Sequence, residues 1–130
     1  MNIIITLPIR FIEAMRKEEK RYEMRKSAPV NFDMQNDIVY VCEKGTGMVV
    51  GYFTVWGMTL TTVYNLANST ILEDICISTT ELVEYAKNHP ALMLYNIETF
   101  YNIEPRPISE FGIQTPPQSY AYTKVRQAVQ

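Results

Sequence analysis

The side chains best suited to chemistry lie together in the heptad Lys-Arg-Tyr-Glu-Met-Arg-Lys, which runs from Lys20 to Lys26. Glu23 stands at its centre, with Arg21 and Arg25 two positions away on either side. A carboxylate between two guanidiniums can fix their orientations while their other N–H groups stay free to donate to a ligand. In an extended segment alternate side chains share a face, which would group Glu23 with both arginines and place the two lysines opposite. The heptad predicts a site for an anionic or polar ligand, and the alternative is a solvated strand whose charges pair with one another.

Each charged residue of the heptad has a functional and a structural interpretation. We expect Lys20, Arg25 and Lys26 to contact a phosphate group or a base edge, because arginine offers a planar fork and lysine a mobile point charge. Lys26 and Arg21 are alternatively a solvated rim. Glu23 is expected either to accept a hydrogen bond from a base edge or to orient Arg25. Its structural alternative is an ion pair that holds the first helix to the sheet.

The length and composition suit a single globular domain over residues 1–130. A hydrophobic content of 47% with 20% charged residues argues against global disorder. No stretch approaches the ~20 apolar residues of a membrane span. The apolar start, residues 1–7, is too short for a signal peptide. We therefore expect a cytoplasmic protein without a membrane partner.

The net charge of −2 conceals an uneven distribution. Residues 1–30 hold seven basic and four acidic side chains, whereas residues 31–130 hold five basic and ten acidic ones. A local basic patch on an acidic body fits a nucleotide or a nucleic-acid strand that binds at one place. It argues against coating of long duplexes, which requires neutralisation of many phosphates.

The chain offers few ligands for a metal. Cys42 and Cys76 are isolated cysteines without C-x-x-C spacing, and His89 is the only histidine. A zinc site needs more ligands than these. We expect reduced thiols, no metal and no cofactor.

The N-terminal part predicts a strand followed by a helix. Residues 2–6 are apolar and β-branched, as in a buried strand. Pro8 suits the first turn of a helix, and Thr6 is the candidate N-cap. Apolar residues then recur at helical spacing until about Glu18 or Glu19, which places the heptad just after the helix.

The remainder predicts more strands than helices. Residues 37–43 and 48–56 form a hairpin around the turn at residues 44–47, which lacks the spacing of a phosphate loop. Ser78 and Glu81 form a capping box for a helix that reaches about Asn88. Further strand-like stretches are residues 58–63, 92–97, 99–103 and 119–123, while residues 64–74 are ambiguous. The pattern predicts an α+β fold, a small twisted or closed β-sheet with two main helices packed on it.

Several segments, in order along the chain, match the pattern of one family. They are Thr6-Leu7-Pro8, Lys20-x-x-Glu23-x-Arg25, Gly51-Tyr52-Phe53-Thr54-Val55, Ser78 to Tyr85, Arg106-Pro107-Ile108 and Pro116-Pro117-Gln118-Ser119-Tyr120. They resemble, in the same order, the strand-to-helix entry, the signature at the end of the first helix, the central strand and the second helix of the ASCH family, and the last two together resemble its closing segment. This family is a branch of the PUA-like superfamily, and the resemblance spans nearly the whole chain.

The resemblance implies a PUA-like small β-barrel with a cleft beside the first helix, into which the signature residues face. Relatives in the superfamily bind RNA, and some hold a modified base between aromatic walls. Some ASCH proteins are hydrolases that remove acyl groups from modified cytidines, and others are linked to RNA cleavage. The amidohydrolase group uses a lysine, a threonine three residues on and a distant glutamate. Lys20 matches the lysine, but Glu23 stands at the threonine position and cannot replace a hydroxyl nucleophile; the candidates for the distant glutamate are Glu73, Glu81 and Glu84.

Two further groups of residues are candidate contacts. Trp56 is the only tryptophan, and stacking of an aromatic ring on a base contributes ~1–3 kcal/mol. Its alternative, shared with Tyr40, Tyr52 and Phe53, is a place in the core. Gln118 and Ser119 are expected to close the cleft, unless the preceding prolines merely direct the chain into its last strand.

The sequence thus supports three functions. The first is a module that binds RNA, a nucleotide or a modified nucleobase through Lys20, Glu23, Arg25, Lys26, Trp56, Gln118 and Ser119. The second is a hydrolase of a modified nucleoside or an RNA phosphodiester, in which Lys20 and Arg25 stabilise negative charge and Glu23 is the general base. The third is an adaptor or regulator that binds a protein through an aromatic and Met-rich surface. The ligand, the oligomeric state and the pathway stay open.

Overall fold

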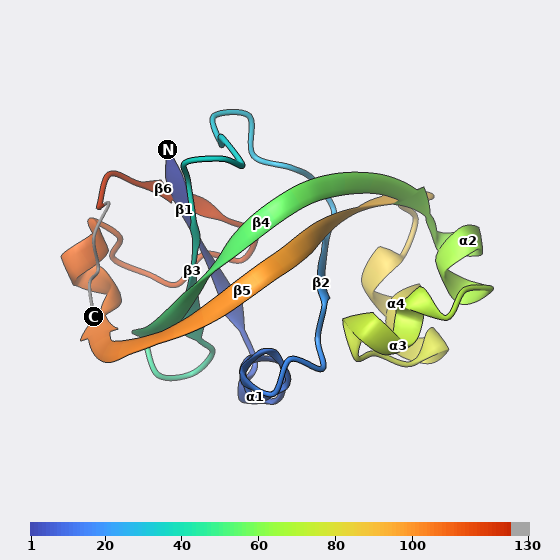
Figure 1. Ribbon diagram of the computed structural model, residues 1–130, viewed down its shortest axis with the longest axis horizontal. Helices are drawn as coiled ribbons and strands as arrows, with labels where there is room; N and C mark the ends of the chain where they lie inside the picture. Colours follow the sequence, from blue (N-terminus) through green and yellow to red (C-terminus); the bar gives the residue numbers. More distant parts are fainter. Residues whose placement is uncertain (126–130) are drawn as a thin grey trace.

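A computed structural model describes residues 1–125 as one six-stranded sheet with helices on it (Figure 1). The strand order is β2-β5-β4-β3-β1-β6. Along the chain the elements are β1 (Asn2–Leu7), α1 (Ile9–Arg16), β2 (Tyr22–Arg25), β3 (Val39–Glu43), β4 (Met48–Thr62), α2 (Val63–Ala67), α3 (Ile71–Ile75), α4 (Thr79–Ala86), β5 (Ala91–Pro107), the 3-10 helix η1 (Ile108–Phe111) and β6 (Ala121–Thr123).

β1 is a nearly continuous apolar run because both of its faces are covered. Ile3 and Ile5 join a core cluster with α1, whereas Ile4, on the opposite face, packs with Tyr40 and Phe111. Apolar residues on both faces of a strand remove the alternation that a half-exposed strand shows. The expected strand at residues 2–6 is confirmed and extends by one residue to Leu7.

β1 and β3 pair in parallel, and this pairing positions the site. Thr6 lies beside Cys42 and Leu7 beside Glu43 in the register of the two strands. The Lys44 backbone N–H then donates to the Leu7 carbonyl at 2.8 Å. The end of β1 is therefore held against the turn that joins β3 to β4.

β4 and β5 are two long antiparallel strands that run across the molecule and carry α2, α3 and α4 at one end (Figure 1). Their pairing shifts register between Val49 and Gly51 and on both sides of Val55. The stretches expected at residues 58–63, 92–97 and 99–103 are parts of these two continuous strands, except that Val63 begins α2. The sequence predicts shorter strands because these irregularities break the alternation. The hairpin expected around residues 44–47 is confirmed.

The helices differ from the expectation in two details. Thr6 is not an N-cap: the cap residue of α1 is Pro8, without a side-chain bond, because Thr6 continues β1 to its end. α1 also stops at Arg16, one turn earlier than expected. The capping box of Ser78 and Glu81 is confirmed, with both reciprocal bonds present in α4.

The sheet does not confirm the expected barrel. Within residues 1–125 its order begins at β2 and ends at β6, and these two edge strands do not pair with each other. The ambiguous residues 64–74 form most of α2 and α3, two short helices that connect β4 to α4. The α+β class is confirmed, and the expected two main helices are α1 and α4. In the described part of the chain, no helix is long and apolar enough to cross a membrane.

Candidate functional site

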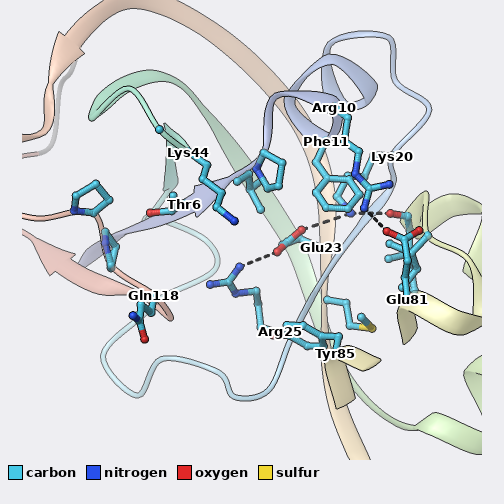
Figure 2. A pocket seen from close by; sticks show the side chains of 18 residues that line it. Thr6, Arg10, Phe11, Lys20, Glu23, Arg25, Lys44, Glu81, Tyr85 and Gln118 are labelled. Carbon is cyan, nitrogen blue, oxygen red and sulfur yellow. Dashed lines mark hydrogen bonds and ion pairs between the residues drawn. The ribbon is translucent and has the colours of Figure 1, made fainter. Parts of the chain in front are cut away.

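A cavity of about 600 Å³ opens between α1, β2, the helical end of the molecule and the segment before β6 (Figure 2). This volume lies within the usual range of ~300–1,000 Å³ for ligand pockets. Apolar walls come from Phe11, Ile75, Ile77 and Tyr85, and polar groups from several elements interrupt them. The cavity can therefore enclose a flat, partly apolar molecule that also carries polar groups.

Lys20 forms one charged part of the wall and is held on three sides. Its side chain is almost wholly buried, and Nζ donates to the Ile75 carbonyl at 2.7 Å. The same nitrogen lies 3.4 Å from Glu23 Oε1 and 4.5 Å from the centre of the Phe11 ring. Burial lowers the pKa of Lys20, and the negative charge of Glu23 opposes this effect.

Glu23 links Lys20 to Arg25 across the cavity wall (Figure 2). Arg25 Nη1 donates to Glu23 Oε2 at 3.0 Å, and Nη2 donates to the Ser119 carbonyl. Burial works against the charge of Arg25, but the Coulomb attraction and hydrogen bond of Glu23 outweigh it and raise the pKa of Arg25. We call Lys20, Glu23 and Arg25 the buried triad; with one carboxylate for two cations, it keeps a net positive charge.

The alternation expected for the heptad is wrong at its first two residues. β2 begins only at Tyr22, so Lys20 precedes the strand and turns to the side of Glu23 and Arg25. Arg21 is exposed and does not line the cavity. The backbone turn before the strand, where Glu18 has a φ of 62°, changes the direction of these side chains.

Three more charged residues line the cavity. Arg10 of α1 pairs with Glu81 of α4, which joins the two helices across one side of the cavity. Lys44 reaches the cavity from the turn between β3 and β4. Thr6 also lines it, with a buried hydroxyl oxygen that has no hydrogen-bond partner within residues 1–125.

The remaining predicted contacts are only partly brought together. Gln118 lines the cavity, whereas Ser119 contributes its backbone carbonyl to Arg25. Lys26 stays outside, with Nζ 5.0 Å from the ring centre of Tyr85, a lining residue. Trp56 is 61% exposed on β4 and does not line the cavity, so this structure does not place it with the other candidates.

Of the three candidate glutamates, only one lines the cavity. Glu81 lines the cavity, but its carboxylate already bonds the Ser78 backbone N–H and Arg10. Glu73 and Glu84 are exposed and lie outside the lining. Within the described residues, no group of three or more His, Cys, Asp or Glu side chains is placed to hold a metal ion.

The sequence alone did not identify some of the lining residues as binding groups. These residues are Thr6, Arg10, Phe11, Lys44 and Tyr85. Thr6 and Tyr85 stood within the family-like segments, so a signal existed for them. The sequence around Lys44 gave no such signal, because Lys44 reaches the cavity only through the parallel pairing of β1 with β3.

No protein-family model matches the chain, and no curated protein matches it. Solved structures do match. A serine-to-alanine mutant of the ASCH protein of Zymomonas mobilis, ZmASCH, superposes with a TM-score of 0.81 at 15% identity, covering 95% of this chain and 88% of that one. The structure of ASCH from the same organism gives a TM-score of 0.77 at 16% identity, covering 95% of this chain and 87% of that one. The chain therefore has the ASCH domain fold.

Proposed function

We propose that this protein binds RNA, a nucleotide or a modified nucleobase in the cavity beside α1. The observation that carries the proposal is the buried triad in the cavity wall, where Lys20, Glu23 and Arg25 are 3%, 4% and 9% exposed. The two thiols, Cys42 and Cys76, are unpaired, which suits a reducing compartment such as the cytoplasm.

Stability alone gives little reason to bury such a triad. Desolvation of buried ions commonly offsets their attraction, and apolar residues of similar volume often serve stability equally well. Here the charges border a cavity, and the guanidinium of Arg25 keeps N–H groups beyond those bonded to Glu23 and Ser119. A polar ligand would use these donors, which supports a role in recognition.

The apolar part of the wall suits a base. Phe11 and Tyr85 offer flat rings, and Ile75 and Ile77 offer apolar surface on the helical side. The pKa of the Tyr85 hydroxyl, ordinarily 10.0, is raised further by burial, and the group is protonated at neutral pH and can donate. A base between these walls would pack against apolar surface while the triad and Gln118 contact its polar edge.

Titration of the purified protein with nucleosides, nucleotides and short RNAs, followed by calorimetry, tests the proposal. Arg25→Ala should weaken binding about tenfold or more, because a hydrogen bond to a charged group contributes about 1.5–3 kcal/mol. The matched control is Arg106→Ala, which removes an arginine paired with Glu110 outside the cavity lining and should leave binding unchanged. Absence of binding to every compound, or equal binding by wild type and Arg25→Ala, would reject the proposal.

A second candidate function, hydrolysis in the same cavity, is favoured by the placement of one carboxylate between two basic side chains in the cavity wall. For an RNA phosphodiester, Lys20 and Arg25 would stabilise the developing negative charge and Glu23 would act as the general base. Incubation with labelled RNA and with acyl-nucleosides tests it. Turnover that disappears in Lys20→Ala and Glu23→Ala supports hydrolysis, whereas no turnover, or turnover that both variants retain, removes it.

A further inference from the structure

The charged groups of the cavity wall leave an unbalanced positive charge on one side. Arg10 and Glu81 neutralise each other at the helical side. Glu23 is the single carboxylate between Lys20 and Arg25. Lys44 lines the cavity and takes part in none of the ion pairs among the described residues. The surplus of two positive charges therefore belongs to the triad and to Lys44.

Uncommitted hydrogen-bonding groups lie on this same side. Figure 2 shows the Lys44 side chain extending toward the Glu23–Arg25 pair. Arg25 has five N–H donors, and it donates one hydrogen bond to Glu23 and one to the Ser119 carbonyl. The buried Thr6 hydroxyl has no partner within residues 1–125, which is unfavourable unless a ligand supplies one.

The backbone holds these groups in place without a ligand. Thr6 and Lys44 are tied together by the pairing of β1 with β3 and by the bond from the Lys44 N–H to the Leu7 carbonyl. Arg25 ends β2, which pairs with β5 through Met93. Groups carried by a sheet are positioned more firmly than groups on a loop, so Thr6 and Arg25 require little ordering when a ligand binds, whereas the exposed Lys44 side chain, on the turn after β3, becomes ordered on binding.

We propose that Thr6, Arg25 and Lys44 form a subsite for a phosphate monoester. The ligand is then a nucleotide, or an RNA that ends in a phosphate, and not a free nucleobase or nucleoside. A phosphate monoester carries about −1.5 to −2 charges at neutral pH and three acceptor oxygens, which matches the surplus and the available donors. An internal phosphodiester carries a single negative charge and would leave part of the surplus unbalanced. This inference rests on the proposed function, because the base would occupy the apolar part of the same cavity.

The test compares each nucleoside with its own 5′- and 3′-monophosphate by calorimetry. Wild type should bind one of the monophosphates about tenfold or more tightly than the nucleoside, through charge-assisted hydrogen bonds. Lys44→Ala should remove most of this advantage, measured as the ratio of the monophosphate affinity to the nucleoside affinity. Thr6→Val, which keeps the β-branched shape, should reduce the advantage in the same way. Lys17→Ala is the matched control, since Lys17 is exposed and does not line the cavity.

The outcomes separate the two proposals. Equal binding of nucleosides and monophosphates refutes the phosphate subsite and leaves the proposed function intact. Absence of binding to all of them, and to RNA, rejects both. An advantage of the monophosphate that survives Lys44→Ala places the phosphate elsewhere and overturns the subsite. Short RNAs with and without a 5′-phosphate then distinguish a terminal RNA phosphate from a mononucleotide.

Discussion

Glu23 is the side chain on which the other charges of the cavity depend. Its two oxygens face different cations, with Lys20 Nζ 3.4 Å from one and Arg25 Nη1 3.0 Å from the other. Both cations are buried, so neither has bulk water as a substitute partner. Loss of this carboxylate would leave two uncompensated charges at the cavity wall.

We predict that Glu23→Gln lowers the free energy of unfolding by about 3 kcal/mol, because removal of one partner of a buried ion pair is strongly destabilising. Urea unfolding measures the change. The control is Glu110→Gln, which breaks the exposed pair with Arg106 and should cost less than about 1 kcal/mol. Equal small losses in both variants would mean that the triad contributes no more than a surface pair.

Tyr95 makes the folding stability of the protein depend on pH in the alkaline range. Its side chain is wholly buried, and its hydroxyl donates to the Ser27 carbonyl at 2.7 Å. Burial raises the pKa of Tyr95 well above its ordinary value of 10.0. Below the ordinary pKa the hydroxyl is protonated in both the folded and the unfolded chain. Above it the unfolded chain loses the proton first, so folding stability falls as the pH rises.

Tyr95→Phe should therefore flatten the alkaline loss of stability. Urea unfolding between about pH 8 and about pH 11 should show a steeper decline for wild type than for the variant. At the lower pH the variant should be less stable by about 1 kcal/mol, the usual contribution of one hydrogen bond. The exposed Tyr64→Phe serves as the control and should follow wild type. Parallel curves for wild type and Tyr95→Phe would contradict the assignment.

Charge and spacing in the heptad were enough to predict that Glu23 and Arg25 form an ion pair. The position of Lys20 could not be predicted, because it depends on where β2 begins and on the turn at Glu18. Trp56 illustrates the opposite limit. An aromatic residue next to an apolar strand has the same local sequence whether it faces a ligand, the core or solvent, and here it faces solvent.

Among the strands and helices, β4 and β5 are the two longest strands, and Gly51 lies where they leave no space for a Cβ atom. A Cβ atom at Gly51 would lie 2.6 Å from the Tyr101 carbonyl oxygen and would also meet the Phe100 ring. A backbone oxygen cannot move aside as the end of a side chain can. Any larger residue at this position therefore requires the two strands to separate.

Gly51→Ala should destabilise the fold by about 1–3 kcal/mol, the usual effect of overpacking. Thermal unfolding measures it. The comparison is Gly57→Ala on the same strand, where the nearest atom to a Cβ would be the Asn96 side-chain nitrogen at 3.1 Å. This variant should lose less stability, because that side chain can adjust. A neutral Gly51→Ala, or a larger loss at Gly57, would contradict the reasoning.

The elements that depend on neighbours in sequence were the ones that could be predicted. The turn at residues 44–47 and the capping box of Ser78 and Glu81 require only local bonds, and both are confirmed. The continuity of β4 and β5 was missed because their register shifts interrupt the alternation. The parallel pairing of β1 with β3, which brings Lys44 to Thr6, joins segments far apart in the chain and has no local signal.

Taken as a whole, the protein presents to potential partners a cavity with a surplus of positive charge. Outside the cavity lie individually exposed apolar side chains of β4, α2 and α4, namely Trp56, Leu60, Tyr64 and Val83, none of which lines the cavity. The cavity is the proposed site for a nucleotide or RNA, and the adaptor hypothesis would instead use some of these exposed apolar side chains.

Nuclear magnetic resonance of the ¹⁵N-labelled protein during titration with a nucleotide or short RNA separates these alternatives most directly. We expect the shifted backbone signals to map to residues 6–11, 20–25 and 75–77, the Trp56 indole signal to stay in place, and Arg25→Ala to reduce the changes strongly at equal ligand concentration. Changes centred on Trp56 and Tyr64, or a map that Arg25→Ala leaves unaltered, would contradict ligand recognition by the buried triad.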